Sequence, residues 1–219
     1  MKSKSHWNDV KNKVINELQA IFRKYPQQYF SEHDIHSVLY HLTQKQLKQH
    51  GETSQTTLDG YNTSLVHHEY PTPFRCDMQG YKFQHMGEEK RTPKGGLYKR
   101  GHYDLVILNP DFIKNNTLDI VCGKTYKKLR SILPRLSIPL LIWACEIIYF
   151  PRIKKIPKNA IKTIEQDTLK IKETKNCNFC KIGSVHVFTS HPQILAAHLE
   201  QQTAQLAERQ QIEITFTKA

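Results

Sequence analysis

The N-terminal part of the chain has apolar residues at the spacing of an amphipathic helix. They recur every three or four residues, which predicts one helix that ends before Pro26. Ser31, with Asp34 three residues later, has the spacing of a capping box, so a second helix is expected over 32–47. The apolar positions of the first helix are Trp7, Val10, Val14, Leu18 and Ile21.

The rest of the chain alternates between strand-like and helix-like segments. Segment 51–64 is polar and predicts a loop, and 65–70 predicts a short strand that Pro71 and Pro73 would end. Alternation of strands and helices predicts an α/β fold, with a central mixed sheet covered by helices on both faces. Further strands are expected at 81–83, 102–108, 140–150, 184–188 and 212–216, helices at 114–133, 157–174 and 193–210, and an exposed loop at 88–100.

Length and hydropathy predict one soluble, cytoplasmic domain. The chain has 219 residues and 38% hydrophobic residues, enough for one folded core. Its longest apolar run, 138–150, is shorter than the ~20 residues of a membrane span, so no membrane partner is expected. Within a single domain, 1–29 would be a helical extension and 189–219 a C-terminal helix and strand. The oligomeric state stays open, and a dimer is one of the alternatives.

The positive charge is concentrated in one part of the sequence. The formal net charge is +12, and segment 80–175 contains 20 Lys and Arg against 9 Asp and Glu. This distribution suits a polyanionic partner such as nucleic acid, although solvated surface charge is an equal alternative. Arg91, Lys94, Lys99 and Arg100 precede Asp104 in a Gly-bearing loop, so they are candidates for phosphate contacts.

Two carboxylates interrupt the most apolar strand-like segments. Asp104 lies in 102–108, and Glu146 lies in the long apolar run. An isolated buried carboxylate is costly, so each needs a partner. If the two strands pair, both carboxylates could bind one hard cation such as Mg²⁺. The alternative is that each carboxylate pairs separately with a Lys or an Arg.

The order of these motifs resembles the PD-(D/E)XK, or restriction-endonuclease-like, nuclease superfamily. Asp104 in Gly-His-Tyr-Asp and Glu146 in Ala-Cys-Glu are similar to the two acidic residues of that motif. The resemblance implies an αβββαβ core and hydrolysis of phosphodiester bonds in DNA, with Mg²⁺ or Mn²⁺ as cofactor. It implies metal ligation by Asp104, Glu146 and the carbonyl of Ile147, with Glu69 as an added acidic ligand. Glu32 and Asp167 would be accessory residues.

The sequence departs from the family motif at its lysine. Ile148 occupies that position, and an aliphatic side chain neither donates a hydrogen bond nor carries charge. Lys170, on the segment that resembles the Asp-x-x-Lys of the following helix, is the candidate replacement, and Lys154 and Lys155 are others. The alternative function is a catalytically inactive nuclease fold that binds nucleic acid or a protein.

Five scattered cysteines argue against a disulfide framework. Cys177 and Cys180 have the spacing of half a zinc site, which His186 and His191 could complete. Because the sequence has no second Cys-x-x-Cys, free thiols in a turn are the favoured alternative.

Overall fold

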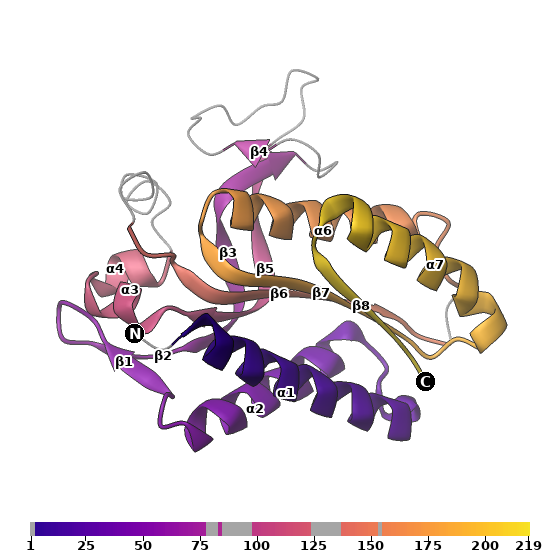
Figure 1. Cartoon of the computed structure of the whole chain (residues 1–219), viewed down its shortest axis with the longest axis horizontal. Helices are drawn as coiled ribbons and strands as arrows, with labels where there is room; N and C mark the ends of the chain where they lie inside the picture. The colour runs from indigo at the N-terminus through magenta and orange to yellow at the C-terminus, as the bar shows by residue number, and fades with distance from the viewer. Residues whose placement is uncertain (1–2, 78–82, 85–97, 124–136, 153–154) are drawn as a thin grey trace.

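The computed structural model describes residues 3–77, 83–84, 98–123, 137–152 and 155–219 (Figure 1). Over these residues the chain forms a mixed sheet in the order β4-β3-β5-β6-β7-β8. β3 pairs antiparallel with β4 and β5, β5 pairs antiparallel with β6, and β6–β7 and β7–β8 are parallel. The strands are β3 (Val66–Asp77), β4 (Phe83–Gln84), β5 (Tyr98–Leu108), β6 (Leu141–Phe150), β7 (Cys180–Thr189) and β8 (Glu213–Lys218).

Helices cover both faces of this sheet (Figure 1). α1 (Lys4–Lys24) and α2 (Glu32–Gln49) lie on one face, and α6 (Ala160–Asn176) and α7 (Gln193–Gln210) lie on the other. The predicted α/β class, with a central mixed sheet flanked by helices, is therefore confirmed. Each parallel pair is joined through one helix, because parallel neighbours need a crossover connection.

The apolar patterns of the sequence explain these elements. α1 buries the predicted stripe, including Trp7 and Leu18, and the capping box of Ser31 and Asp34 begins α2. β6 is buried at every position because it has a strand on each side and helices on both faces. This is why the long apolar run is a strand of the core.

Several predicted boundaries are wrong. Segment 51–64 contains a short hairpin of β1 (Ser54–Thr56) and β2 (Asn62–Ser64). The strand expected at 65–70 continues to Asp77, because a register shift between Pro71 and Arg75 lets β3 pass through both prolines.

The prediction of one helix over 114–133 is also wrong for the residues that the structure describes, 114–123. That region begins with two short helices, α3 (Pro110–Lys114) and α4 (Leu118–Val121), and 124–136 lie outside the described residues. A short 3₁₀ helix, η1 (Pro26–Gln28), connects α1 to α2. Among the described residues, no helix has the length and hydropathy of a membrane span.

The loop expected over 88–100 is wrong at its C-terminal end, and 88–97 lie outside the described residues. β5 begins at Tyr98, so Lys99 and Arg100 lie on a strand, paired with Cys76 and Arg75 of β3. Arg91 and Lys94 lie outside the described residues, as does most of the strand expected at 81–83.

Candidate metal centre

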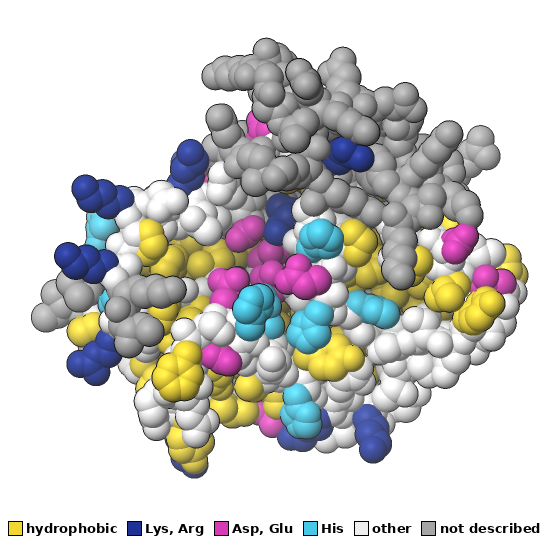
Figure 2. Space-filling view, turned by 180° about the vertical axis from the view of Figure 1, so that it is seen from behind, with side chains coloured by type: hydrophobic (Ala, Val, Ile, Leu, Met, Phe, Trp, Pro, Cys, Tyr) yellow, Lys and Arg dark blue, Asp and Glu magenta, His cyan; other side chains and the backbone are white. Residues whose placement is uncertain are grey.

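Three acidic residues lie at one level on three neighbouring strands. Glu69 on β3 lies between the pairs His68–Leu105 and Tyr70–Tyr103, which sets it opposite Asp104 on β5. Asp104 and Glu146 each lie one residue beyond the pair Leu105–Cys145, which sets them opposite each other on β5 and β6. Figure 2 shows acidic side chains gathered at the centre of one face of the molecule, with histidines beside them. The expectation that Asp104 and Glu146 lie on adjacent strands is confirmed.

Asp104 is held by the backbone of the strand that contains Glu146. Its Oδ2 accepts a hydrogen bond from the amide of Ile147 at 2.6 Å. Burial raises the pKa of Asp104 to about 7, although the Ile147 amide and the Lys170 ammonium both act to lower it. A carboxyl group with this pKa exchanges its proton near neutral pH, and a bound cation would favour its ionised form.

Glu146 is paired with a lysine from helix α6. Its side chain is 2% exposed, and its Oε2 lies 2.7 Å from Lys170 Nζ. Lys170 also lies 3.1 Å from Asp167 Oδ1 and donates to the carbonyl of His102 at 3.0 Å. Glu146 Oε1 is buried and has no hydrogen-bond partner among the described residues. One oxygen of this carboxylate is thus paired with a cation, and the other is left for a ligand.

The electrostatics of this pair follow from its burial. Burial raises the pKa of Glu146 well above its usual range, and the Lys170 ammonium opposes that rise. Burial alone would lower the pKa of Lys170, but Glu146 and Asp167 outweigh it and raise the pKa above its usual range. Lys170 therefore stays positively charged next to Glu146.

A histidine that the sequence did not indicate joins Asp104 and Glu69. His36, Glu69 and Asp104 each offer one ligand atom, and these atoms lie within 4.8 Å of one another. His36 is 6% exposed, its Nε2 lies 3.6 Å from Asp104 Oδ2, and this nitrogen has no hydrogen-bond partner among the described residues. Burial, together with His33 and His68, lowers the pKa of His36 to about 4, so its imidazole is neutral near pH 7. A neutral imidazole can donate a lone pair to a metal.

Glu69 has an unusual backbone conformation within this group. Its φ is 47°, in the left-handed region, which costs a non-glycine residue free energy. It is exposed, and His68 beside it stacks on Tyr40 of α2 with ring centroids 4.4 Å apart. In this conformation a Glu69 carboxylate oxygen lies within 4.8 Å of the ligand atoms of His36 and Asp104.

Glu32 connects helix α2 to strand β6. Its Oε2 accepts a hydrogen bond from the amide of Tyr149 at 3.2 Å, and its Oε1 lies 4.0 Å from His36 Nε2. Burial raises the pKa of Glu32, while the Tyr149 amide opposes the rise. Glu32 and His36 lie one helical turn apart, so they share the face of α2 that turns toward the site. That spacing was the available sequence signal for His36, and it was weak because the chain has 12 histidines.

Ile148 is buried in the core on the same side of β6 as Glu146, because alternate residues of a strand share a face. It supplies no charge, whereas the Lys170 ammonium already contacts Glu146. The side chains of Lys99 and Arg100 are not described, so their expected phosphate contacts stay predictions.

The cysteine pair does not form a comparable site over the described residues. Cys177 donates to Glu173 at 3.7 Å, and Cys180 is buried at the start of β7. Both ring nitrogens of His186 are engaged, one with Ser184 and one with Thr215. His186 is therefore not free to complete a zinc site with the cysteines.

Comparison with protein-family models, with curated proteins and with solved structures gives no match for this chain. The chemistry of the site is therefore argued from its own geometry. Carboxylate oxygens are the preferred ligands of Mg²⁺ and Mn²⁺, and an imidazole extends the range toward softer divalent metals. A lysine that stays charged beside the carboxylates suits a reaction in which negative charge develops.

Proposed function

We propose that this protein is a metal-dependent nuclease-like protein that hydrolyses phosphodiester bonds in DNA, with Mg²⁺ or Mn²⁺ as its cofactor. The observation that supports it most is the contact of Lys170 Nζ with the buried Glu146, one strand from Asp104. Two carboxylates and one ammonium at a single site match the charge that phosphoryl transfer requires.

The order of elements also supports a restriction-endonuclease-like core. Helix α2, strands β3, β5 and β6, helix α6 and strand β7 come in this order along the chain, which matches αβββαβ when the β1–β2 hairpin, the short β4 and the short helices α3 and α4 are set aside. In this arrangement the acidic residues lie on the three successive strands and the lysine lies on the helix that follows them.

Asp104 would be the central metal ligand, because it is next to both groups of potential ligands. His36 and Glu69 lie on one side of it, and β6, with Glu146 and the Ile147 amide that donates to Asp104, lies on the other; the Ile147 carbonyl would be a further ligand. A bound metal would polarise the phosphodiester and lower the pKa of a bound water. Asp167 would act indirectly, by holding Lys170 in place.

Lys170 would offset negative charge, the role that Ile148 cannot fill. Its ammonium is fixed by Glu146, Asp167 and the His102 carbonyl, so little reorganisation is needed during reaction. Glu32 would position the end of α2, and with it His36, through its bond to the Tyr149 amide.

A metal titration tests this proposal. The purified protein is incubated with end-labelled single-stranded and duplex DNA at increasing Mg²⁺ or Mn²⁺, with EDTA as the metal-free reference. Cleavage should require metal, and Asp104→Asn or Glu146→Gln should abolish it. Asp111→Asn and Glu17→Gln, on α3 and α1, are the matched controls and should keep it.

The isoleucine at position 148 favours a second candidate, a nuclease fold that binds nucleic acid without cleaving it. Binding of DNA in EDTA, with no cleavage at any metal concentration, would select this candidate. A protein that neither binds nor cleaves DNA would refute both.

A further inference from the structure

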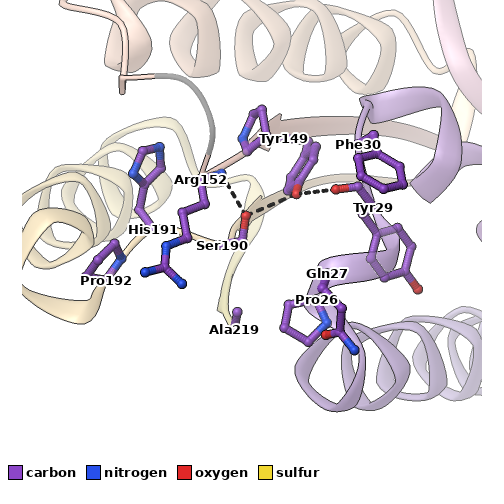
Figure 3. Close-up of a pocket in the computed structure, with 11 residues that line it drawn as sticks. Pro26, Gln27, Tyr29, Phe30, Tyr149, Arg152, Ser190, His191, Pro192 and Ala219 are labelled. Atoms are coloured by element: carbon purple, nitrogen blue, oxygen red, sulfur yellow. Dashed lines mark hydrogen bonds between the residues drawn. The ribbon is translucent and has the colours of Figure 1, made fainter.

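A pocket lies at the C-terminal end of β6, the strand that contains Glu146 (Figure 3). Its volume is about 630 Å³, within the range of small-molecule sites. The segment before α2, the end of β6 and the segment before α7 form its walls. Among its lining residues are Tyr29, Phe30, Tyr149, Arg152, Ser190 and His191.

Hydrogen bonds join the walls of this pocket. Tyr149 Oη donates to the carbonyl of Tyr29 at 2.9 Å and lies 3.1 Å from Ser190 Oγ. Ser190 Oγ in turn accepts from the amide of Arg152 at 2.9 Å. These bonds, drawn in Figure 3, hold the three walls together without filling the space between them.

The pocket offers an exposed aromatic surface. Phe30 is 72% exposed although it is a large apolar residue, and it lies at the rim of the pocket. An aromatic ring left in solvent beside a polar cleft is a suitable platform for a flat ring such as a nucleobase, which can stack on it.

The other side of the pocket suits an anion. In Figure 3 the Arg152 side chain extends between Ser190 and His191, and no carboxylate of the described residues forms an ion pair with it. His191 is 7% exposed, and its Nε2 has no hydrogen-bond partner within the described residues. Helix α7 begins directly after Pro192 without a side-chain cap, so its first amides are available to an anion.

A second pocket, of about 840 Å³, continues from the first and shares Arg152, His191 and Pro192 with it. It adds Lys155 and Lys158, and no Asp or Glu is among the described residues that line either pocket, while Ala219, the last residue of the sequence, lines the first. The positive charge thus extends away from the acidic centre, along a path that a polyanion could follow.

The pocket and the metal centre are built on the same two elements. Tyr149 follows Glu146 by three residues on β6, which is about 10 Å along a strand. Phe30 precedes Glu32 by two residues, and the Glu32 carboxylate accepts the Tyr149 amide. The two sites are thus connected through β6 and Glu32, while the Glu146 and Tyr149 side chains point to opposite faces of the strand.

We infer that this pocket binds an unpaired nucleotide of the substrate strand, with the base on Phe30 and a phosphate at Arg152 and the start of α7. This inference rests on the proposed function and specifies its substrate as single-stranded DNA or a frayed end. A base inside a duplex is paired and stacked, and moving it onto Phe30 would first cost its unpairing.

The inference is tested by binding measurements in EDTA, where cleavage is blocked. The probes are a fluorescent single-stranded oligodeoxynucleotide, the blunt duplex of the same sequence, and free dAMP. The wild type should prefer the single strand, and Phe30→Ala and Arg152→Gln should each weaken its binding at least fivefold. Tyr61→Ala, at 57% exposure on the β1–β2 hairpin, and Lys114→Gln on α3 are the matched controls and should bind as the wild type does.

The outcomes separate this inference from the proposed function. If Phe30→Ala and Arg152→Gln bind the single strand like the wild type while metal-dependent cleavage persists, the pocket inference alone is overturned. If dAMP and the single strand bind in the pocket but no metal condition gives cleavage, the pocket stands as a nucleotide site and the nuclease proposal fails. If none of the three probes binds, the pocket inference fails, and the nuclease proposal is decided by the metal titration alone.

Discussion

Replacing Lys170 by methionine removes the charge next to Glu146 while keeping a side chain of similar length. Glu146 then loses the contact at 2.7 Å, and Asp167 loses the one at 3.1 Å. In the absence of metal the free energy of unfolding should fall by about 3 kcal/mol, the lower end of the cost of breaking a buried ion pair. The Lys170 and Glu146 side chains are 14% and 2% exposed, so solvent screening reduces this cost little.

The loss should grow with pH. Burial already raises the pKa of Glu146, and without Lys170 nothing of equal strength opposes that rise. A carboxyl group whose pKa is higher in the folded than in the unfolded protein contributes fully to the free energy of unfolding below its unfolded pKa. This contribution is lost as pH rises through the folded pKa. The stability difference between wild type and Lys170→Met should therefore be smaller at pH 5 than at pH 8.

Urea denaturation in EDTA at both pH values measures this difference. Lys172→Met is the matched control, because Lys172 lies on the same helix and its ammonium binds the neutral Gln210 amide at 3.1 Å. Its effect should be below about 1 kcal/mol and independent of pH, as expected for one hydrogen bond to a neutral group. Equal effects of the two substitutions at both pH values would refute the role given to Lys170.

The same variants test catalysis. Lys170→Met should lower the cleavage rate by an order of magnitude or more, the scale of losing one electrostatic stabiliser. Ile148→Lys in the Lys170→Met background should restore part of the rate, because position 148 is on the Glu146 side of β6. Full activity of Lys170→Met would contradict the proposal that Lys170 takes the role of the motif lysine whose position Ile148 occupies.

Three further predictions concern metal, pH and salt. Saturating Mn²⁺ or Mg²⁺ should raise the Tm of the wild type by about 2–4 °C and leave Asp104→Asn unchanged in differential scanning fluorimetry; an equal rise in both would place the metal elsewhere. Burial, aided by Lys11, lowers the pKa of His186 to about 3, so its stabilisation is complete above its unfolded pKa and is lost as pH falls toward 3. About 5 kcal/mol is at stake over the whole fall to pH 3, and His186→Asn should flatten the fall in stability between pH 7 and pH 4 in urea titrations. DNA affinity measured between 50 and 200 mM salt should fall with a log–log slope of about −0.7 per phosphate contact on a single strand, and a flat response would argue against phosphate binding.

The parts of the fold that depend on apolar periodicity were predictable from the sequence. The stripe of α1, the capping box of α2 and the continuous apolar run of β6 each have one structural solution. The hairpin of β1 and β2 was missed because its residues are polar on both faces, so backbone pairing alone defines it. β3 was cut short because a bulge that accommodates Pro71 and Pro73 depends on the neighbouring strand.

The candidate site residues that could be predicted from the sequence are those whose charge interrupts an apolar segment. A carboxylate in an apolar strand stands out, so Asp104 and Glu146 were found from sequence alone. His36 was missed because its contact with Asp104 depends on how α2 packs against the sheet, which one sequence does not reveal. Glu69 was given a minor role, and its strained backbone, visible only in three dimensions, is the reason to give it more weight.

The position of Lys170 shows why a sequence motif is a weaker guide to a site than the positions of its charged atoms in three dimensions. An ammonium group acts where its nitrogen lies, and a long side chain lets that nitrogen come from either β6 or the helix packed over it. Lys170 reaches Glu146 from α6, and Ile148 fills the corresponding strand position with an apolar side chain that joins the core. With Lys170 in place a second ammonium at position 148 would face a positive neighbour, so Ile148→Lys alone should gain little activity. The informative comparison is therefore between Lys170→Met and the double variant with Ile148→Lys. Only after Lys170 is removed does Glu146 have an unpaired carboxylate that a lysine at position 148 could contact.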